Sequence, residues 1–469
     1  MTHASLQSVL DLADTPLSYL RSSKATRRDN RIWQPKLIMP QVPYEFTDWE
    51  HEQRAWRESV ALFDQSHHMQ AVIISGPDAK KFLSHMACNN LANANPGRAF
   101  QIVCVAPDGR LVGDGILLQL EENTFAATGP FILNWLAYHA QVLDFEVTSH
   151  IDGRSPVYAN GFDHSRPECR YQLQGPRAWA LLEKLNGGVI ADVPFFHLTE
   201  ISVAGHRMKA LRHGMAGTPG LEIWGDWNAR EVIRDAILKV GEEFGIAEVG
   251  AAAYITSAVE SGWVQGVLPA IYTAEHLRAY REWMPADDLE GLIRITGSQK
   301  RDRLEDYYRT PFDLGYGRLV HFDHEFVGRD ALRERASGPK LQKVTLAWDP
   351  DDTANLFREM LTPGGRNVKF LHLPTMSDKI DLQYFELTAQ GRSIGTAHST
   401  AYLATERTML TLSLVDEAVQ IGNEVLLHWG EAGGGFSGHQ SETTDTIPIR
   451  TTVSPAPYSR VAREEYRKN

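Results

Sequence analysis

One acidic residue lies in a short segment that is otherwise apolar or glycine. Glu222 is the single charged side chain in residues 219–225, which read PGLEIWG. The apolar neighbours predict a short buried strand. A buried carboxylate without a partner is costly. The sequence leaves two partners open, either an internal Arg or Lys, or a ligand that presents paired N–H donors.

Two adjacent histidines are a second candidate for chemistry. His67 and His68 follow Asp64, Gln65 and Ser66. If this segment is a strand, adjacent residues point to opposite faces, so at most one of the two histidines faces a shared site. The polar residues before them indicate a polar pocket. A structural histidine with satisfied hydrogen bonds is the alternative.

A third group has the composition of a metal site. His321 and His324 lie beside Asp323 and Glu325, and such side chains can ligate zinc. A hydrophilic turn before residues 326–328 explains the pattern equally well, so we expect no metal. The sequence also lacks a G-x-S-x-G elbow, a G-x-G-x-x-G loop opening a helix and an H-E-x-x-H motif.

The composition limits the classes of function. The chain has 469 residues and a net charge of −12, which argues against binding to nucleic acid or to an anionic membrane. Its three cysteines form no C-x-x-C pair, so we expect neither a disulfide framework nor a thiolate zinc site. Residues 1–37 lack the apolar run of a signal peptide, and no stretch reaches the length of a membrane span. We therefore expect a cytoplasmic protein.

The elements that must position these residues are mixed in type. Helical spacing predicts helices at residues 78–86, 134–143, 177–185 and 229–244. Short alternating segments predict strands at residues 71–75, 100–105, 111–120, 201–211 and 220–224. From about residue 341 strands dominate, at residues 343–347, 383–388, 408–414 and 424–427. This order indicates an α+β body with an all-β module behind it. The glycine-rich residues 429–438 are expected to form a hairpin tip.

The motifs, taken in order, resemble the aminomethyltransferase (glycine-cleavage T-protein) superfamily. The likeness covers about residues 45–465, in ALFDQSHHM (61–69), SGPDA (75–79), PGRA (96–99), LQGP (173–176), residues 214–222, FDHEFVGRDAL (322–332) and VSPAPYS (453–459). The resemblance implies a three-domain α+β fold around a central folate channel, with a C-terminal all-β barrel-like domain. We place the domains at residues 1–160, 161–340 and 341–469, the first two being interleaved in sequence.

Within the superfamily, a second set of segments is similar to the bacterial vanillate/3-O-methylgallate O-demethylases. These segments are residues 63–69, RHGMAG (212–217), ESGW (260–263), LPAIYT (268–273) and AYREW (279–283). This likeness implies transfer of the methyl group of a methoxylated aromatic acid to tetrahydrofolate, giving the phenol and 5-methyltetrahydrofolate. It implies a small-molecule substrate such as vanillate, syringate, 3-O-methylgallate or dicamba, and no obligate protein partner.

The same resemblance implies roles for individual residues. Glu222 would bind the pterin N–H groups with Gln172 beside it, and Trp263 would pack against the cofactor. Tyr254 lies where these demethylases have an essential tyrosine, with His68 as its polar neighbour. For Tyr254 and Trp263, core packing is the alternative.

The proposed chemistry explains the need for a tyrosine. A methyl ether is inert because its leaving group would be a phenolate, and a proton delivered to the ether oxygen lets a phenol leave instead. The hydroxyl of Tyr254 has a reference pKa near ~10, close to that of the released phenol. Proton transfer between them would then need little driving force, and no metal is required.

The sequence departs from the family patterns at two places. Aminomethyltransferases carry an Asp-Asp pair where this chain has Gly113 and Asp114, which weakens the case for glycine-cleavage chemistry. The vanillate enzymes are expected to hold the substrate carboxylate with an arginine where this chain has Pro130. Gln65 would line the aryl pocket, and Pro130 would change how a carboxylate is held. A 2-methoxybenzoate such as dicamba would suit this change. Equal turnover of vanillate and of the ortho isomer would contradict this substrate hypothesis.

Two rival functions remain open. A demethylase of the same fold could act on a sulfonium or amine methyl donor, whose good leaving group would not need Tyr254 as an acid. A non-catalytic folate-binding protein that assists iron–sulfur assembly or tRNA modification is the second rival. That group has a K-G-C-Y/F-x-G-Q-E signature, whereas residues 260–263 here read ESGW.

Overall fold

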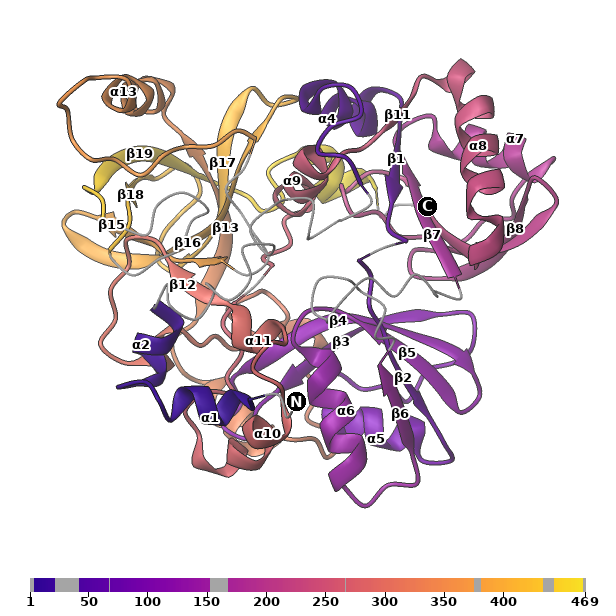
Figure 1. Cartoon of the computed structure of the whole chain (residues 1–469), viewed down its shortest axis with the longest axis horizontal. Coiled ribbons are helices and arrows are strands. Elements are labelled where there is room, and N and C mark those ends of the chain that lie inside the picture. The colour runs from indigo at the N-terminus through magenta and orange to yellow at the C-terminus, as the bar shows by residue number, and fades with distance from the viewer. Residues whose placement is uncertain are drawn as a thin grey trace.

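The computed structural model describes residues 4–21, 42–66, 68–151, 168–265, 267–374, 381–432 and 443–466. Two sheets and a closed barrel surround a common centre, as Figure 1 shows. The expected α+β class and C-terminal barrel are confirmed. The motif residue His67 and most of the glycine-rich residues 429–438 lie outside the described residues.

A six-stranded sheet combines strands from distant parts of the chain. Its strand order is β11 (Ile246–Glu248), β1 (Val60–Asp64), β7 (Glu168–Gln174), β10 (Gly220–Asp226), β9 (His206–Leu211) and β8 (Leu198–Val203). β1 is parallel to β11, and the other neighbours are antiparallel. Helices α7 (Ala178–Asn186) and α8 (Arg230–Gly241) cover one face and bury its apolar side chains. The opposite face carries polar side chains, such as Gln172 and Glu222, among apolar ones such as Phe63 and Trp224.

A five-stranded antiparallel sheet forms the second layer. Its strand order is β3 (Ala99–Val105), β4 (Leu111–Glu121), β5 (Thr124–Thr128), β2 (Val72–Ser75) and β6 (Thr148–Ile151). Helices α5 (Ala79–Met86) and α6 (Ile132–Val142) pack against it through Phe82, Trp135 and Leu136. The same core includes side chains from α1 (Leu6–Leu10), α2 (Pro16–Arg21), α10 (Arg278–Trp283) and α11 (Leu289–Leu292).

The C-terminal barrel closes on itself. Its strand order is β13 (Leu341–Trp348), β17 (Thr408–Asp416), β16 (Arg392–Leu403), β15 (Phe385–Ala389), β18 (Glu424–Trp429) and β19 (Ile447–Ser454). Helix α13 (Pro350–Met360) packs on β19, and the parallel pair β12 (Arg294–Thr296) and β14 (Asp381–Gln383) lies between barrel and body. The shorter helix α12 spans Arg329–Arg335.

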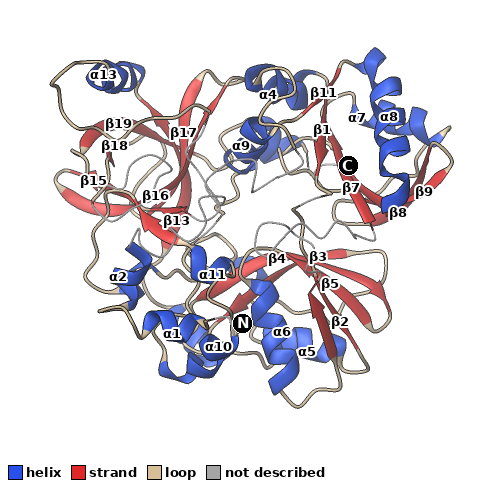
Figure 2. Ribbon diagram, in the orientation of Figure 1, coloured by secondary structure: helices blue, strands red, loops and turns tan. Residues whose placement is uncertain are grey.

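Two helices connect the barrel to the six-stranded sheet. Helix α9 (Ala251–Ser261) packs against β16 and against α4 (Trp49–Glu58), and α4 in turn packs on β1. Figures 1 and 2 show α9 between the barrel and the sheet. Almost every residue of α9 is buried, so the helix holds its side chains in fixed positions.

Some sequence-based elements need correction. The single strand predicted at 201–211 is a hairpin of β8 and β9, because Ala204 and Gly205 adopt φ of 51° and 80° in a tight turn. The strand predicted at 383–388 is divided between β14 and β15. The segment containing His68 is a turn that follows β1 and not a strand. The domain boundaries at residues 160 and 340 stay a prediction.

No helix in the described ranges is long and apolar enough to cross a membrane.

Candidate active site

A cavity of about 460 Å³ lies where the two sheets, the barrel and α9 meet. Its wall includes five of the seven residues singled out from the sequence: His68, Pro130, Glu222, Tyr254 and Trp263. The other two, Gln65 and Gln172, are fully buried behind that wall. The fold therefore brings the predicted residues into one region, although they come from separate parts of the chain.

Strand alternation on β10 points Glu222 toward the cavity. Leu221 and Ile223 are in the core beneath α7 and α8, so the side chain between them must face the other way. Gln172 lies directly opposite Glu222 in the β7–β10 register and therefore shares its face. The two residues are thus neighbours on the side of the sheet that borders the cavity.

Glu222 has internal partners as well as access to the cavity. Its Oε1 accepts a hydrogen bond from Arg170 Nη1 at 2.8 Å, and its Oε2 lies 3.5 Å from His213 Nδ1. Burial opposes ionisation, but His213 and Arg170 outweigh it and lower the pKa of Glu222 below its ordinary value. The carboxylate is therefore ionised at neutral pH. The sequence left open whether the partner of Glu222 is an internal Arg or Lys or a ligand. The structure gives Glu222 an internal arginine, Arg170.

The two buried glutamines connect Glu222 to the tyrosine. Gln172 Nε2 donates to the His213 carbonyl at 2.9 Å, and Gln65 Nε2 approaches Gln172 Oε1 at 3.2 Å. Gln65 Nε2 also approaches Met215 Sδ at 2.7 Å and Tyr254 Oη at 3.4 Å. Gln65 thus supports the wall from behind, and its predicted contact with an aryl ring stays a prediction.

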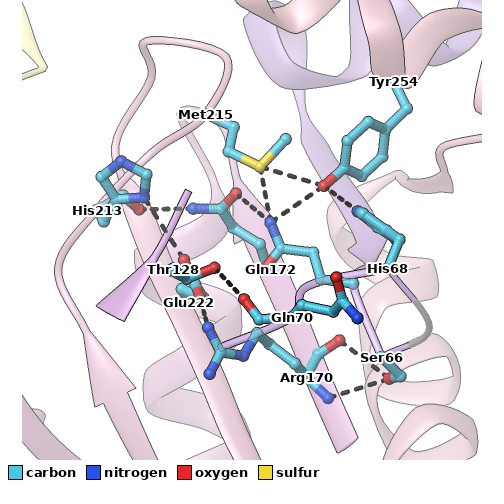
Figure 3. A network of polar contacts seen from close by, with 11 residues as sticks. Ser66, His68, Gln70, Thr128, Arg170, Gln172, His213, Met215, Glu222 and Tyr254 are labelled. Atoms are coloured by element: carbon cyan, nitrogen blue, oxygen red, sulfur yellow. Dashed lines mark hydrogen bonds and ion pairs between the residues drawn. The ribbon is translucent and has the colours of Figure 1, made fainter. Parts of the chain in front are cut away.

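Tyr254 and His68 form the central polar pair of the site (Figure 3). Tyr254 Oη lies 2.8 Å from His68 Nε2 and 3.2 Å from Met215 Sδ. The Tyr254 ring packs edge-on against Phe63 at 5.4 Å between centroids. Burial raises the pKa of Tyr254 well above its ordinary value, a shift that the hydrogen bond from Gln65 only partly offsets. The hydroxyl is therefore protonated across the physiological range.

Tyr254 and Trp263 are positioned by the same helix. Tyr254 lies in the first turns of α9, where its N–H bonds the Gly250 carbonyl at 2.9 Å. The helix ends at Gly262, whose φ of 70° favours glycine. Trp263 follows immediately, and its N–H bonds the Ala258 carbonyl at 2.9 Å. A single element therefore places the tyrosine and the tryptophan along one wall.

Asp114 borders the cavity from β4. Its Oδ2 accepts hydrogen bonds from Gln101 Nε2 at 3.0 Å and Tyr316 Oη at 3.1 Å. Burial raises the pKa of Asp114, an effect that these donors and Trp263 reduce. The residue noted from the sequence only as a departure from the family pattern is thus part of the wall.

Several residues of the cavity wall, and Arg170 beside it, were not singled out individually from the sequence. Arg170, His213 and Met215 surround Glu222 and Tyr254 (Figure 3), and Asp288 and Glu290 line another part of the cavity. Their positions depend on sheet register and on a short helix far along the chain. For Arg170, the buried glutamate was the only available indication that a cation must lie nearby.

The possible metal ligands lie elsewhere. His324 Nε2 bonds the Ala87 carbonyl at 3.1 Å, and His321 Nε2 lies 3.3 Å from the Arg318 carbonyl. Neither histidine lines the cavity. Within the described ranges, no three His, Cys, Asp or Glu side chains are grouped so that they could hold a metal ion.

Comparison with known proteins identifies the family. The model of the GCVT N-terminal domain matches residues 20–266. The chain belongs to the GCVT family. The syringate O-demethylase of Sphingobium sp. (strain NBRC 103272 / SYK-6) is 37% identical over 464 residues, which cover 98% of this chain and 97% of the relative. The resemblance inferred from the sequence motifs is confirmed.

Two further relatives agree with this assignment. The sesamin methylene transferase of Sinomonas sp. (strain No.22) is 26% identical over 440 residues, covering 89% of this chain and 90% of the relative. The glycine cleavage system aminomethyltransferase T from Bartonella henselae has the same fold, with a TM-score of 0.59 at 19% identity over 91% of this chain and 92% of that one. This GCVT family member is therefore a methyltransferase-type enzyme.

Proposed function

We propose that this GCVT family enzyme moves the methyl group of a methoxylated aromatic acid to tetrahydrofolate and releases the corresponding phenol with 5-methyltetrahydrofolate. The observation that carries the proposal is the Tyr254–His68 pair, whose 2.8 Å contact lies on the wall of the cavity that also contains Glu222. The similarity to a syringate O-demethylase over nearly the whole chain supports it.

The cavity wall has features that suit tetrahydrofolate. Glu222 presents an ionised carboxylate, which can accept two N–H donors from a pterin ring. Phe196 and Trp263 line the same cavity and can cover flat aromatic surfaces. We assign cofactor binding to Glu222 and Trp263, with Gln172 holding the loop at His213 in place. When bound, tetrahydrofolate supplies the nitrogen that accepts the methyl group.

Tyr254 would serve as the proton donor to the ether oxygen. Burial keeps the proton on Tyr254 Oη, so the group approaches the substrate as a donor. From the sequence, the pKa of Tyr254 was expected to match that of the released phenol. The raised pKa of Tyr254 corrects this expectation, because complete loss of the proton would leave an unfavourable buried tyrosinate. His68 Nε2 lies close enough to pass a proton to Tyr254 Oη as the first one leaves, a step in which an imidazolium would become a neutral imidazole. We therefore assign His68 as the proton relay.

This arrangement favours an ether over the rival methyl donors. A sulfonium group already has a good leaving group, and neither it nor an amine donor explains a buried hydroxyl with a histidine behind it. The four aromatic acids, vanillate, syringate, 3-O-methylgallate and dicamba, are the candidate substrates. Pro130 lines the cavity where the related demethylases are expected to have an arginine, so the carboxylate must be held elsewhere.

A direct assay tests the proposal. The purified full-length chain would be incubated with tetrahydrofolate and each of the four candidates, and the phenol and 5-methyltetrahydrofolate would be followed by chromatography. Equal molar formation of both products from one candidate would support the reaction. Folate binding without turnover of any of them, together with turnover of a sulfonium donor, would replace it with the rival.

A further inference from the structure

The cavity has a second polar region, formed by α6 and α11. Asn134, in the first turn of α6, donates its Nδ2 to Asp288 Oδ2 at 3.2 Å and to Glu290 Oε2 at 3.0 Å. Asp288 is the N-cap of α11, and Glu290 lies in its first turn. All three residues line the same cavity as Tyr254. We call these three residues the acid–amide group.

The acid–amide group lies next to the position where an arginine is missing. Pro130 and Phe131 immediately precede α6, and both line the cavity with Asn134. Among the described lining residues none is an arginine, and Lys343 is the one lysine. The part of the wall nearest to Pro130 therefore presents acceptors and an amide. A substrate carboxylate pointed here would be repelled.

The two carboxyl groups share their charge at neutral pH. Burial raises the pKa of Asp288 to about 6 and, together with the Asp288 charge, raises the pKa of Glu290 to about 7. Near pH 7 the pair therefore holds part of one proton and can both accept and donate a hydrogen bond. This suits a neutral hydroxyl, which does both, better than it suits a full cation or an anion.

An independent feature of the cavity also indicates a polar ligand. His398, on β16, is 2% exposed and lines the cavity, and neither of its ring nitrogens makes a hydrogen bond of good geometry with a described residue. Burial and the neighbouring Arg309 lower its pKa to about 3, an effect that a contact with the Gln383 backbone only partly offsets. A buried neutral imidazole with poorly satisfied ring nitrogens is stabilised when a ligand or water bonds it.

We propose that the acid–amide group is the subsite that binds a ring hydroxyl of the aromatic substrate, so that the enzyme selects methoxyphenols over methoxyarenes without that hydroxyl. The inference deepens the proposed function and rests on it for the identity of the aromatic ligand. Vanillate, syringate and 3-O-methylgallate carry such a hydroxyl, whereas dicamba does not. The three hydroxylated acids are therefore the preferred candidates.

Binding measurements test this subsite independently of turnover. Vanillate and 3-methoxybenzoate differ only in the 4-hydroxyl, and their dissociation constants would be measured by calorimetry on the full-length protein. A hydrogen bond to a charged acceptor predicts that vanillate binds about tenfold to about a hundredfold more tightly. Glu290→Gln and Asp288→Asn should each reduce this ratio, and neither should change the affinity for 3-methoxybenzoate by a comparable factor.

Glu282→Gln is the matched control, because Glu282 lies on α10, is exposed and is outside the cavity wall. It should leave the ratio unchanged. Thermal unfolding of each variant would verify that it is folded. Equal affinity for the two ligands in the wild type, or an unchanged ratio in both folded variants, would overturn the subsite. If the ratio behaves as expected but no methoxyarene is demethylated, the subsite stands and the proposed reaction fails.

Discussion

The hydroxyl of Tyr254 can be removed with little change to the packing around it. Tyr254→Phe retains the ring and its edge-on contact with Phe63, so no cavity of side-chain size is created. The variant loses the 2.8 Å contact with His68 and the 3.2 Å contact with Met215. Leaving a buried histidine without its partner predicts a loss of about 1–3 kcal/mol in the free energy of unfolding, which a protein of this size should tolerate.

The effect on turnover should be much larger. General acid catalysis contributes about 10²- to 10⁴-fold, which corresponds to about 3–5 kcal/mol of transition-state stabilisation. We expect kcat for the methoxylated substrate to fall by that factor, while the dissociation constant of the substrate changes little. An electron-withdrawing ring substituent makes the phenolate a better leaving group, so such a substrate should lose less activity in the variant.

Tyr171→Phe is the matched control for this experiment. Tyr171 is also buried and donates its hydroxyl to the Arg230 carbonyl at 2.9 Å, but it lies in the core beneath α7 and α8, away from the cavity. It should lose some stability and retain its kcat. If Tyr254→Phe keeps kcat within about threefold of the wild type, or loses no more than Tyr171→Phe, the role of Tyr254 as an acid is wrong.

Three further predictions concern charged groups. Glu222→Gln removes the carboxylate beside His213 and should weaken tetrahydrofolate binding about tenfold to a hundredfold by fluorescence titration. The pKa of Glu290 is raised, so its stabilising contribution is complete below about pH 4.5 and is lost as the pH rises through about 7. In the wild type this loss lowers the free energy of unfolding by about 3 kcal/mol over this pH range, and the decrease should be absent in Glu290→Gln. Glu431→Gln leaves buried Lys369 without its 3.0 Å partner and should cost about 3–5 kcal/mol by denaturant unfolding.

Each of these predictions has a control and a contrary outcome. Glu200→Gln changes an exposed glutamate of β8 and should not alter folate binding; equal losses in the two variants would exclude a direct contact by Glu222. An unchanged pH profile of stability in Glu290→Gln would mean that the raised pKa belongs to another group. Glu431 contacts Lys369 and the Gly297 amide away from the cavity, so a loss of kcat in folded Glu431→Gln would contradict its structural role.

Much of the fold could be predicted where the local pattern is strong. The helix predicted at 78–86 and the strands predicted at 100–105 and 111–120 correspond to α5, β3 and β4. Their apolar periodicity agrees with the tertiary structure. The strand predicted at 201–211 failed because two apolar halves around Ala204 and Gly205 resemble one continuous strand.

The site was predictable only in part, for a physical reason. Glu222 could be recognised because a charge between buried apolar residues needs a partner. Tyr254, Trp263 and Gln172 required the family resemblance, since aromatic and amide side chains in apolar segments usually pack in the core. The acid–amide group could not be foreseen, because Asn134 and Glu290 are separated by 156 residues in the chain and meet only through the packing of α6 beside α11.

The cavity wall is built from elements that tolerate change to different degrees. Helix α9 supports both the barrel and the six-stranded sheet and carries Tyr254, so substitutions that change the volume of its buried side chains disturb the packing of both. Helix α11 has four residues and contributes Asp288 and Glu290 from its first turn. During evolution, a new aromatic compound could thus be accommodated by altering α11 and the start of α6 while α9 stays unchanged. Such a division would allow related enzymes to change their specificity for aromatic compounds while the residues around Tyr254 stay the same.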